Sequence, residues 1–212
     1  MTGFQPNRGD VRRFHRSNPL AHIIRELPPR LERLAAELRC PPDGRVLDYG
    51  CGIGSDGLRL LQRGYQVEFA DFDNPSARYL RWRLERHGIA APVHDVERDV
   101  PSGFDAVYCF DVIEHVDDPF AFLARLEQHA AVVIVNFLAP SPDDTHLHRP
   151  LDIDLLLDYV EQRGLVHHRV YHGRSHLVAY RPAKNASVRS RLERRVGPWR
   201  AKLDARLSVV RT

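Results

Sequence analysis

The chain has 212 residues, of which 43% are hydrophobic and 28% are charged, so it fits one globular domain with modest extensions. Its three cysteines, Cys40, Cys51 and Cys109, are few and odd in number, so they do not imply a disulfide framework, and we expect a reducing cytoplasm. The N-terminal segment lacks the apolar region of a signal peptide. The longest apolar run, 130–139, is shorter than the roughly 20 residues of a membrane-spanning helix.

The formal net charge of +3 is unevenly distributed. From Lys184 onward the chain has nine Lys and Arg residues and two acids, whereas the preceding body has 22 basic and 26 acidic residues. The tail therefore sets the basic pI of about 8.9. For this reason the pI does not indicate a nucleic-acid-binding face on the main domain.

From the N-terminus onward, helical and strand patterns alternate. The predicted helices cover 28–40, 55–64, 74–88, 118–129 and 152–164. The predicted strands cover 45–49, 65–70, 91–94, 104–110 and 131–138, and a closing hairpin covers 165–171 and 175–182. This alternation predicts a doubly wound parallel sheet, in which ligands bind beyond the carboxyl ends of the strands. We therefore expect the functional residues within 48–54, 71–73, 94–96, 110–115 and 139–148.

The loop after the first strand, in VLDYGCGIGSDGL (46–58), is rich in glycine. Gly52, Gly54 and Gly57 fit the G-x-G-x-x-G pattern of dinucleotide-binding loops. However, Asp48 places a carboxylate where a pyrophosphate would be repelled. The same carboxylate suits the cationic sulfur and amino group of S-adenosylmethionine, directly or through water. A simple tight turn and a nicotinamide site remain the alternatives.

The segment VLDYGCGIG resembles motif I of the class I S-adenosylmethionine-dependent methyltransferases, whose pattern is acidic-x-G-x-G-x-G. Three further segments resemble later motifs of that family in the expected order: VEFADFD (67–73), HDVE (94–97) and FDAVYCFDVIEHVDDP (104–119). The last is similar to the small-molecule branch related to ubiquinone-biosynthesis enzymes. The resemblance covers roughly residues 30 to 181, and it implies a Rossmann-like, seven-stranded sheet with an antiparallel last strand.

The resemblance also implies S-adenosylmethionine as the cofactor and a role for each residue that matches a motif. Asp71 would bind the ribose hydroxyls and Phe72 would flank the adenine, with Asp73 as the alternative ribose ligand. Asp95 would accept from the adenine amino group, and Val96 would give it a backbone contact. The full predicted cofactor set is Asp48, Gly50, Cys51, Gly52, Gly54, Asp71, Phe72, Asp95, Val96, Phe110 and Asp111.

Histidines after the fourth and fifth strands are the candidates for acceptor chemistry. A hydroxyl acceptor needs a general base or a metal, and a histidine with a pKa near 6.5 suits a base at neutral pH. We therefore predict catalytic roles for His115, His146 and His148, with Glu114 near the substrate. A magnesium-type site of Asp143, Asp144, His146, His148 and Asp111 is the alternative, but its spacing is irregular and no metal is expected.

Residues 1–27 are predicted to form an arm or lid, in which Phe14 and His15 contact the acceptor. The methyltransferase domain is expected at 28–183, and residues 184–212 form a basic amphipathic tail. Packing against the domain or a second copy is expected for this tail. Binding to an anionic membrane surface or an anionic substrate is the alternative.

These patterns predict a methyltransferase that acts on a small molecule, most simply on the hydroxyl of a sugar or secondary metabolite. An RNA or protein methyltransferase that uses the tail is the first rival, but FDVIEH lacks the N/D-P-P-Y/F pattern of enzymes that methylate base nitrogens, so nucleic acid is not the expected partner. A non-catalytic partner subunit that binds the cofactor is the second rival. A third retains the cofactor but uses it for another reaction, such as a cyclisation.

Overall fold

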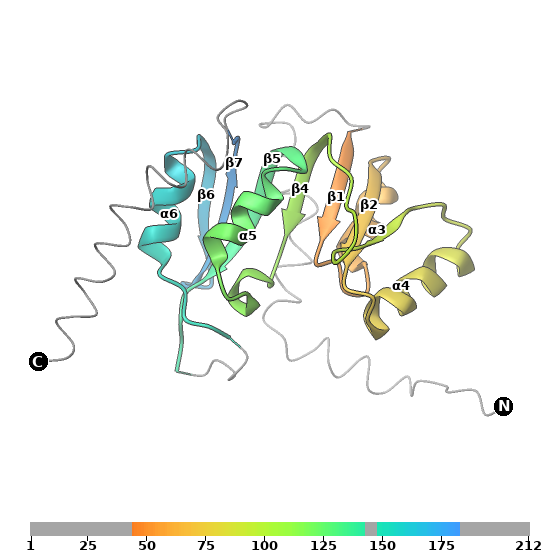
Figure 1. The fold of residues 1–212 in the computed structure, drawn as a ribbon, viewed down its shortest axis with the longest axis horizontal. Coiled ribbons are helices and arrows are strands. Elements are labelled where there is room, and N and C mark those ends of the chain that lie inside the picture. The colour runs from red at the N-terminus through yellow and green to blue at the C-terminus, as the bar shows by residue number, and fades with distance from the viewer. Residues whose placement is uncertain (1–43, 143–147, 183–212) are drawn as a thin grey trace, which may run out of the picture.

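The computed structural model describes residues 44–142 and 148–182 of the chain. They form a seven-stranded sheet in the order β3-β2-β1-β4-β5-β7-β6 (Figure 1). Only β7 runs against its neighbours, since it pairs antiparallel with both β5 and β6. The strands are β1 Arg45–Tyr49, β2 Gln66–Asp71, β3 Val93–Asp95, β4 Phe104–Cys109, β5 Ala130–Leu138, β6 Leu165–Tyr171 and β7 Ser175–Tyr180. The predicted fold class is therefore confirmed.

Four α-helices and one 3₁₀ turn connect the described strands: α3 Ser55–Leu61, α4 Pro75–Arg86, η1 Ile113–His115, α5 Pro119–Leu126 and α6 Ile153–Glu161. A polar N-cap residue precedes each of the helices α4, α5 and α6. The side chains of these residues, Asn74, Asp118 and Asp152, accept hydrogen bonds from backbone amides of the first turn. Pro75 and Pro119 occupy the first turns of α4 and α5, where a missing amide hydrogen costs nothing.

The helices cover both faces of the sheet. One core cluster joins residues of α5 and α6 to the sheet, and a second joins residues of α3 and α4 to its other face. In β1, Leu47 belongs to the first cluster and Val46 to the second, because successive strand residues point to opposite faces. The central strands are buried on both sides, as their continuous apolar sequences predict.

The predicted element ends differ from the observed ones by a few residues, and η1 was not predicted. The predicted helix 28–40, the arm 1–27 and the tail 184–212 lie outside the described residues. Among the residues that are described, no helix combines the length and the apolar character needed to cross a membrane.

Candidate functional site

The glycine loop after β1 adopts a conformation that few other residues tolerate. Gly50, Gly52 and Gly54 all have positive φ angles, of 73°, 52° and 71°. A Cβ atom on Gly50 would lie 2.5 Å from Val112 Cγ2, and one on Gly54 would lie 2.4 Å from Leu80 Cδ1. In contrast, a Cβ on Gly52 would meet nothing within 4 Å. Gly52 is therefore the point of the loop that a ligand can approach.

Hydrogen bonds attach this loop to the end of β2. The amides of Gly50 and Cys51 donate to the Ala70 carbonyl at 2.8 and 3.2 Å, and the Gly52 amide donates to Asp71 Oδ2 at 2.7 Å. These contacts fix the loop against the strand whose end carries the predicted ribose ligand.

Asp71 is 9% exposed and is held in place from several sides. Its Oδ1 accepts from the Phe72 amide at 2.7 Å and from Asn74 Nδ2 at 3.0 Å, in addition to the bond from Gly52 to Oδ2. A carboxylate offers roughly four acceptor positions, so three bonds leave room for about one more. Its neighbour Phe72 is 57% exposed. Asp73, in contrast, faces solvent. Its Oδ1 accepts a hydrogen bond from Arg81 at 2.8 Å, and this bond lowers the pKa of Asp73.

The structure places Asp48 differently from the simplest sequence interpretation. Its carboxylate is only 5% exposed, and its Oδ2 accepts from the Gly57 amide of α3 at 3.2 Å. Burial raises its pKa to about 7, against the lowering effect of the nearby Tyr108 hydroxyl. At neutral pH Asp48 therefore carries only part of its charge and lies beneath α3. This geometry therefore disfavours the predicted direct contact between Asp48 and a cationic ligand.

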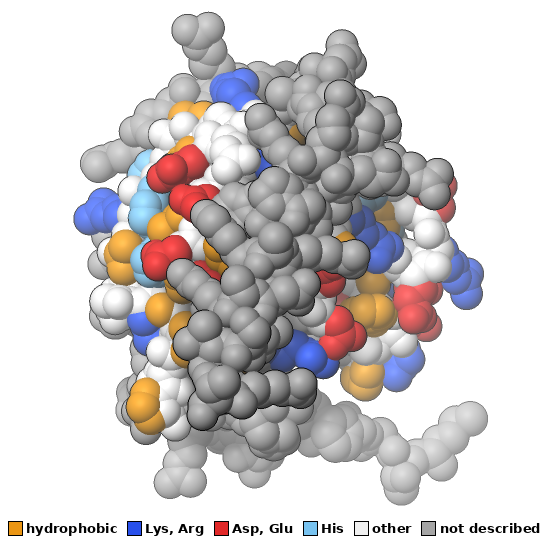
Figure 2. Space-filling view, turned by 60° about the vertical axis from the view of Figure 1, so that its left-hand side comes forward, with side chains coloured by type: hydrophobic (Ala, Val, Ile, Leu, Met, Phe, Trp, Pro, Cys, Tyr) orange, Lys and Arg blue, Asp and Glu red, His pale blue; other side chains and the backbone are white. Residues whose placement is uncertain are grey.

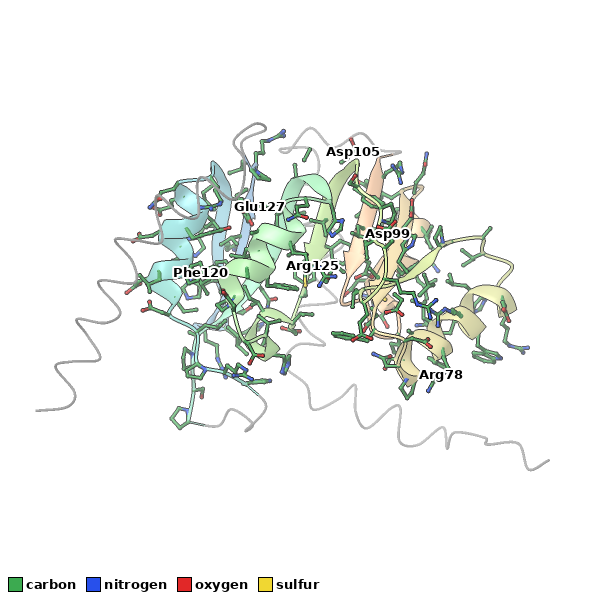
Figure 3. All side chains as sticks on the ribbon, in the orientation of Figure 1. Arg78, Asp99, Asp105, Phe120, Arg125 and Glu127 are labelled. Carbon is green, nitrogen blue, oxygen red and sulfur yellow. The ribbon has the colours of Figure 1, made fainter. Side chains whose placement is uncertain are left out.

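Asp95 is the last residue of β3 and pairs with Asp71 at the end of β2, and Val96 follows it. Asp95 Oδ1 accepts from the Glu97 amide at 3.1 Å, and its Oδ2 lies 3.3 Å from Arg98 Nε. The Val96 amide donates to the Asp71 carbonyl at 3.0 Å, and the Val96 carbonyl accepts from Arg125, which reaches over from α5 (Figure 3). Both backbone groups of Val96 therefore already have hydrogen-bond partners, so an adenine that contacts this backbone would have to share them with Asp71 or Arg125.

Phe110 and Asp111 follow β4. The Phe110 ring lies 5.3 Å from that of Tyr108, centroid to centroid. Asp111 has φ of 54°, a left-handed conformation that is rare for residues other than glycine. Its backbone amide donates to Asn136 Oδ1, and Asn136 Nδ2 donates to Asp111 Oδ1, both at 2.8 Å. Burial raises the pKa of Asp111, while Asn136 and the nearby His115 lower it.

Glu114, His115 and His148 lie together beyond the ends of β4 and β5. One ligand atom from each falls within 4.8 Å of the others. The rings of His115 and His148 pack edge to face, with centroids 4.9 Å apart. Glu114 is 2% exposed, and no group among the described residues donates a hydrogen bond to its Oε2. Burial raises the pKa of Glu114, and Asp111 raises it further. Two imidazoles and one carboxylate in this arrangement can relay a proton or bind a divalent cation.

A cavity of about 230 Å³ lies next to this cluster, where η1 and α5 meet the segment that leads into α6. Its lining is mostly apolar, and an ion pair between Asp117 and Arg149 lies among the lining residues. Phe120 points from α5 toward α6 (Figure 3) and lies 5.4 Å from Tyr159, ring to ring. The lining residues are Val116, Asp117, Pro119, Phe120, Arg149, Pro150, Leu151, Asp152, Leu155 and Leu156.

The described cysteines do not have the character of nucleophiles. Burial raises the pKa of the Cys51 thiol, and the carboxylates of Asp48 and Asp71 raise it further. Cys109 is fully buried in the sheet, and burial raises its pKa well above the ordinary value. Neither thiolate forms readily at neutral pH.

Two histidines of the β6–β7 hairpin form a second group. His168 Nε2 lies 3.1 Å from His176 Nδ1, and their rings stack at 5.3 Å. On the face shown in Figure 2, histidine side chains gather beside acidic ones.

The structure brings most of the predicted site residues to one edge of the sheet. The predicted acceptor residues Phe14, His15 and His146 lie outside the described residues. Sequence reasoning missed Asn136, although an amide inside the apolar run AAVVIVNFL (130–138) is an anomaly that could have indicated a special role. It also missed Asp56, whose buried Oδ1 accepts no hydrogen bond from the described residues and whose pKa burial raises to about 6. Nothing in the sequence distinguished this acid from any other in a first helical turn.

Comparison with known proteins agrees with this geometry. The family described as methyltransferase domain matches residues 20–178, which is more than half of the chain. The ubiquinone biosynthesis O-methyltransferase of Xanthomonas campestris pv. campestris (strain B100) is 33% identical over 101 residues, 45% of this chain and 42% of the relative. Its counterpart in Rhodopseudomonas palustris (strain TIE-1) is 34% identical over 122 residues, 55% of this chain and 48% of the relative. The chain thus spans less than half the length of these curated relatives.

A solved structure shows the same fold. The magnesium protoporphyrin IX methyltransferase of Synechocystis PCC 6803, with bound SAH, has a TM-score of 0.60 and 18% sequence identity. The likeness covers 86% of this chain and 90% of that one. The chain therefore belongs to the methyltransferase domain family, and its fold is that of the class I S-adenosylmethionine-dependent methyltransferases.

Proposed function

We propose that this chain transfers a methyl group from S-adenosylmethionine to an oxygen atom of a small molecule. The observation that carries the proposal is the meeting of two sites at one edge of the sheet. An open glycine loop with its anchored carboxylate lies at the ends of β1 and β2, and a histidine–glutamate cluster lies beyond β4 and β5. The names of the curated relatives, which are O-methyltransferases, support the choice of oxygen.

The residues present fit the cofactor. Gly52 leaves open space where a substituent would otherwise be, and Asp71 retains an acceptor position for a ribose hydroxyl next to it. The exposed ring of Phe72 offers a flat apolar surface for the adenine. Asp56 and Asp111 add carboxylates beside the loop, which favour the positively charged methionine end. When bound, S-adenosylmethionine supplies an electrophilic methyl group on a cationic sulfur.

The protein's part in the transfer is to position the acceptor, exclude water and accept a proton. His115 and His148 lie close enough together for either imidazole to take the hydroxyl proton, and Glu114 stabilises the imidazolium that results. Direct transfer needs no covalent intermediate on the protein, in keeping with the inert cysteines.

The cavity beside the cluster is the proposed site for the body of the acceptor. Phe120, Leu151 and Leu155 give it apolar walls, and the ion pair of Arg149 with Asp117 gives it polar groups. This lining suits a secondary metabolite with an apolar or aromatic ring better than it suits a sugar, whose hydroxyls require many polar partners.

A second candidate mechanism uses the same cluster to hold a divalent cation. The observation that favours it is Glu114, whose buried Oε2 lacks a hydrogen-bond donor among the described residues and whose carboxylate has an oxygen within 4.8 Å of both imidazoles. A cation bound by Glu114, His115 and His148 would lower the pKa of the acceptor hydroxyl and so replace the general base.

The test combines a product screen with matched histidine variants. Pooled small metabolites are incubated with the protein and S-adenosylmethionine, and products that gain one methyl group are sought by mass spectrometry. His148→Ala and His115→Ala should lower turnover by at least about tenfold while cofactor affinity stays the same, because general base catalysis contributes roughly 10²–10⁴-fold. His168→Ala, on the hairpin, is the matched control and should retain full turnover.

Dialysis against a chelator separates the two mechanisms. Turnover that survives the chelator supports an imidazole base, whereas turnover that is lost and returns with added Mg²⁺, Mn²⁺ or Zn²⁺ supports the cation. Full turnover in both histidine variants would refute the assignment of this cluster to the reaction.

A further inference from the structure

Asn136 is the one polar side chain of β5, and it is 6% exposed. The strand lies between β4 and β7, so the amide is surrounded by the sheet and its helices. A buried amide needs hydrogen-bond partners, and an apolar residue would fill the same space without that requirement. The hydrogen-bond partners of Asn136 therefore indicate why this buried position has a polar residue.

Asn136 contacts Asp111 through both ends of its amide group. Its Oδ1 accepts from the Asp111 backbone amide, and its Nδ2 donates to the Asp111 carboxylate, each at 2.8 Å. The remaining contact, with Ser175 Oγ, is longer at 3.5 Å. Together the two short bonds fix the backbone and the side chain of a residue with φ of 54°. Aspartate tolerates this left-handed conformation better than most residues do, and the two bonds help to hold it there.

The carboxylate held in this way lies between the two parts of the proposed active site. On one side, Val112 packs against Gly50 of the glycine loop. Asp111 also raises the pKa of Asp56, in the first turn of α3. On the other side, the chain runs from Asp111 into η1, where His115 packs against His148 with ring centroids 4.9 Å apart, and both imidazoles lower the pKa of Asp111.

We propose that Asn136 is a positioning residue, which keeps the Asp111 carboxylate at this junction so that its charge faces the cationic sulfur of the methyl donor. Asn136 itself touches no ligand and acts through Asp111. The inference rests on the proposed function, because it requires that the donor binds at the glycine loop.

The test compares the affinities of two ligands that differ in charge. S-adenosylmethionine carries a positive charge on sulfur, whereas SAH, its demethylated product, does not. The ratio of their affinities therefore reports on the charge near the sulfur, and calorimetry measures both. In Asn136→Leu, which keeps the buried space filled, the preference for S-adenosylmethionine should fall by about threefold to fivefold, the scale of a partly exposed charge contact. Asn136→Ser also loses both bonds and should show the same fall.

A merely structural role predicts a different result. General loosening of the site lowers both affinities together and leaves the ratio unchanged, which would overturn the inference. Tyr180→Phe, on the neighbouring β7, is the matched control, because it removes a buried hydrogen bond to Glu127 far from the loop and should leave the ratio as it is.

A double variant tests whether the two residues act together. Asp111→Asn should lower the ratio by itself, and adding Asn136→Leu should lower it no further if Asn136 acts only through Asp111. Independent losses that add would overturn the inference. A wild-type chain that binds neither ligand would refute the proposed function and this inference with it, whereas binding with an unchanged ratio in Asn136→Leu refutes this inference alone.

Discussion

The replacement of Asp71 by alanine tests the cofactor site most directly. In the structure its carboxylate accepts three hydrogen bonds, from the amides of Gly52 and Phe72 and from Asn74, and retains about one acceptor position for a ligand. A hydrogen bond between a hydroxyl group and a charged carboxylate contributes about 1.5–3 kcal/mol. The loss of this bond alone should weaken binding by at least about tenfold, since each 1.4 kcal/mol is a factor of ten.

Asp71→Ala also removes the acceptor that holds the Gly52 amide, so the loop should loosen and add to the loss. Three donors without partners, partly reached by water, should lower the free energy of unfolding by roughly 1–3 kcal/mol. Binding of S-adenosylmethionine is therefore measured by calorimetry at a temperature where circular dichroism shows the variant to be folded.

Asp73→Ala is the matched control, because Asp73 is the neighbouring acid and the alternative ribose ligand. Asp73 faces solvent and bonds to Arg81, so its replacement should change cofactor affinity by less than about twofold. An unchanged affinity in Asp71→Ala, or a larger loss in Asp73→Ala, would refute the assignment of Asp71 to the ribose.

Three further predictions concern the loop, the buried acid and the tail. Gly52→Ala should weaken cofactor binding by about tenfold or more, because the methyl group fills the open side of the loop. Gly88→Ala is its matched control, since Gly88 also has a positive φ and open space around it but lies at the end of α4, so it should lose only stability. Asp48 has a folded-state pKa of about 7, raised from 3.8 by burial, so it stabilises the fold fully below about pH 4 and this contribution is lost as the pH rises through 7. Asp48→Asn should therefore make urea unfolding less dependent on pH between 4 and 8, and an unchanged slope would contradict the burial argument. Deletion of residues 184–212 should spare methylation of a small acceptor but abolish any activity on RNA, and loss of the small-molecule activity would show that the tail belongs to the site.

Local patterns in the sequence were sufficient to predict the order of the elements. Asn74 with Pro75 and Asp118 with Pro119 marked helix starts, and the structure confirms both. The antiparallel last strand came from the resemblance to a family and was equally correct. Helix ends were predicted less well, because the last turn depends on how the following chain packs.

The site was predictable where chemistry depends on the backbone and less so where it depends on distant partners. The positive φ angles at Gly50, Gly52 and Gly54 follow from glycine in a tight loop. The role of Asp48 did not follow, because its exposure depends on how α3 packs above β1. Likewise no pattern in the sequence paired Asn136 with Asp111, which lie 25 residues apart.

The sequence by itself determined the doubly wound sheet, the glycine loop and the edge at which ligands bind, because each depends on local backbone preference and on the alternation of strands and helices. Only the tertiary structure decided which acids face the cleft and which lie beneath a helix. It also showed that His148 packs directly against His115, with ring centroids 4.9 Å apart, where the sequence predicted only that both lie at the same edge. Burial and the choice of hydrogen-bond partner arise from residues far apart in the chain, so they set the charge of each acid only after the chain has folded.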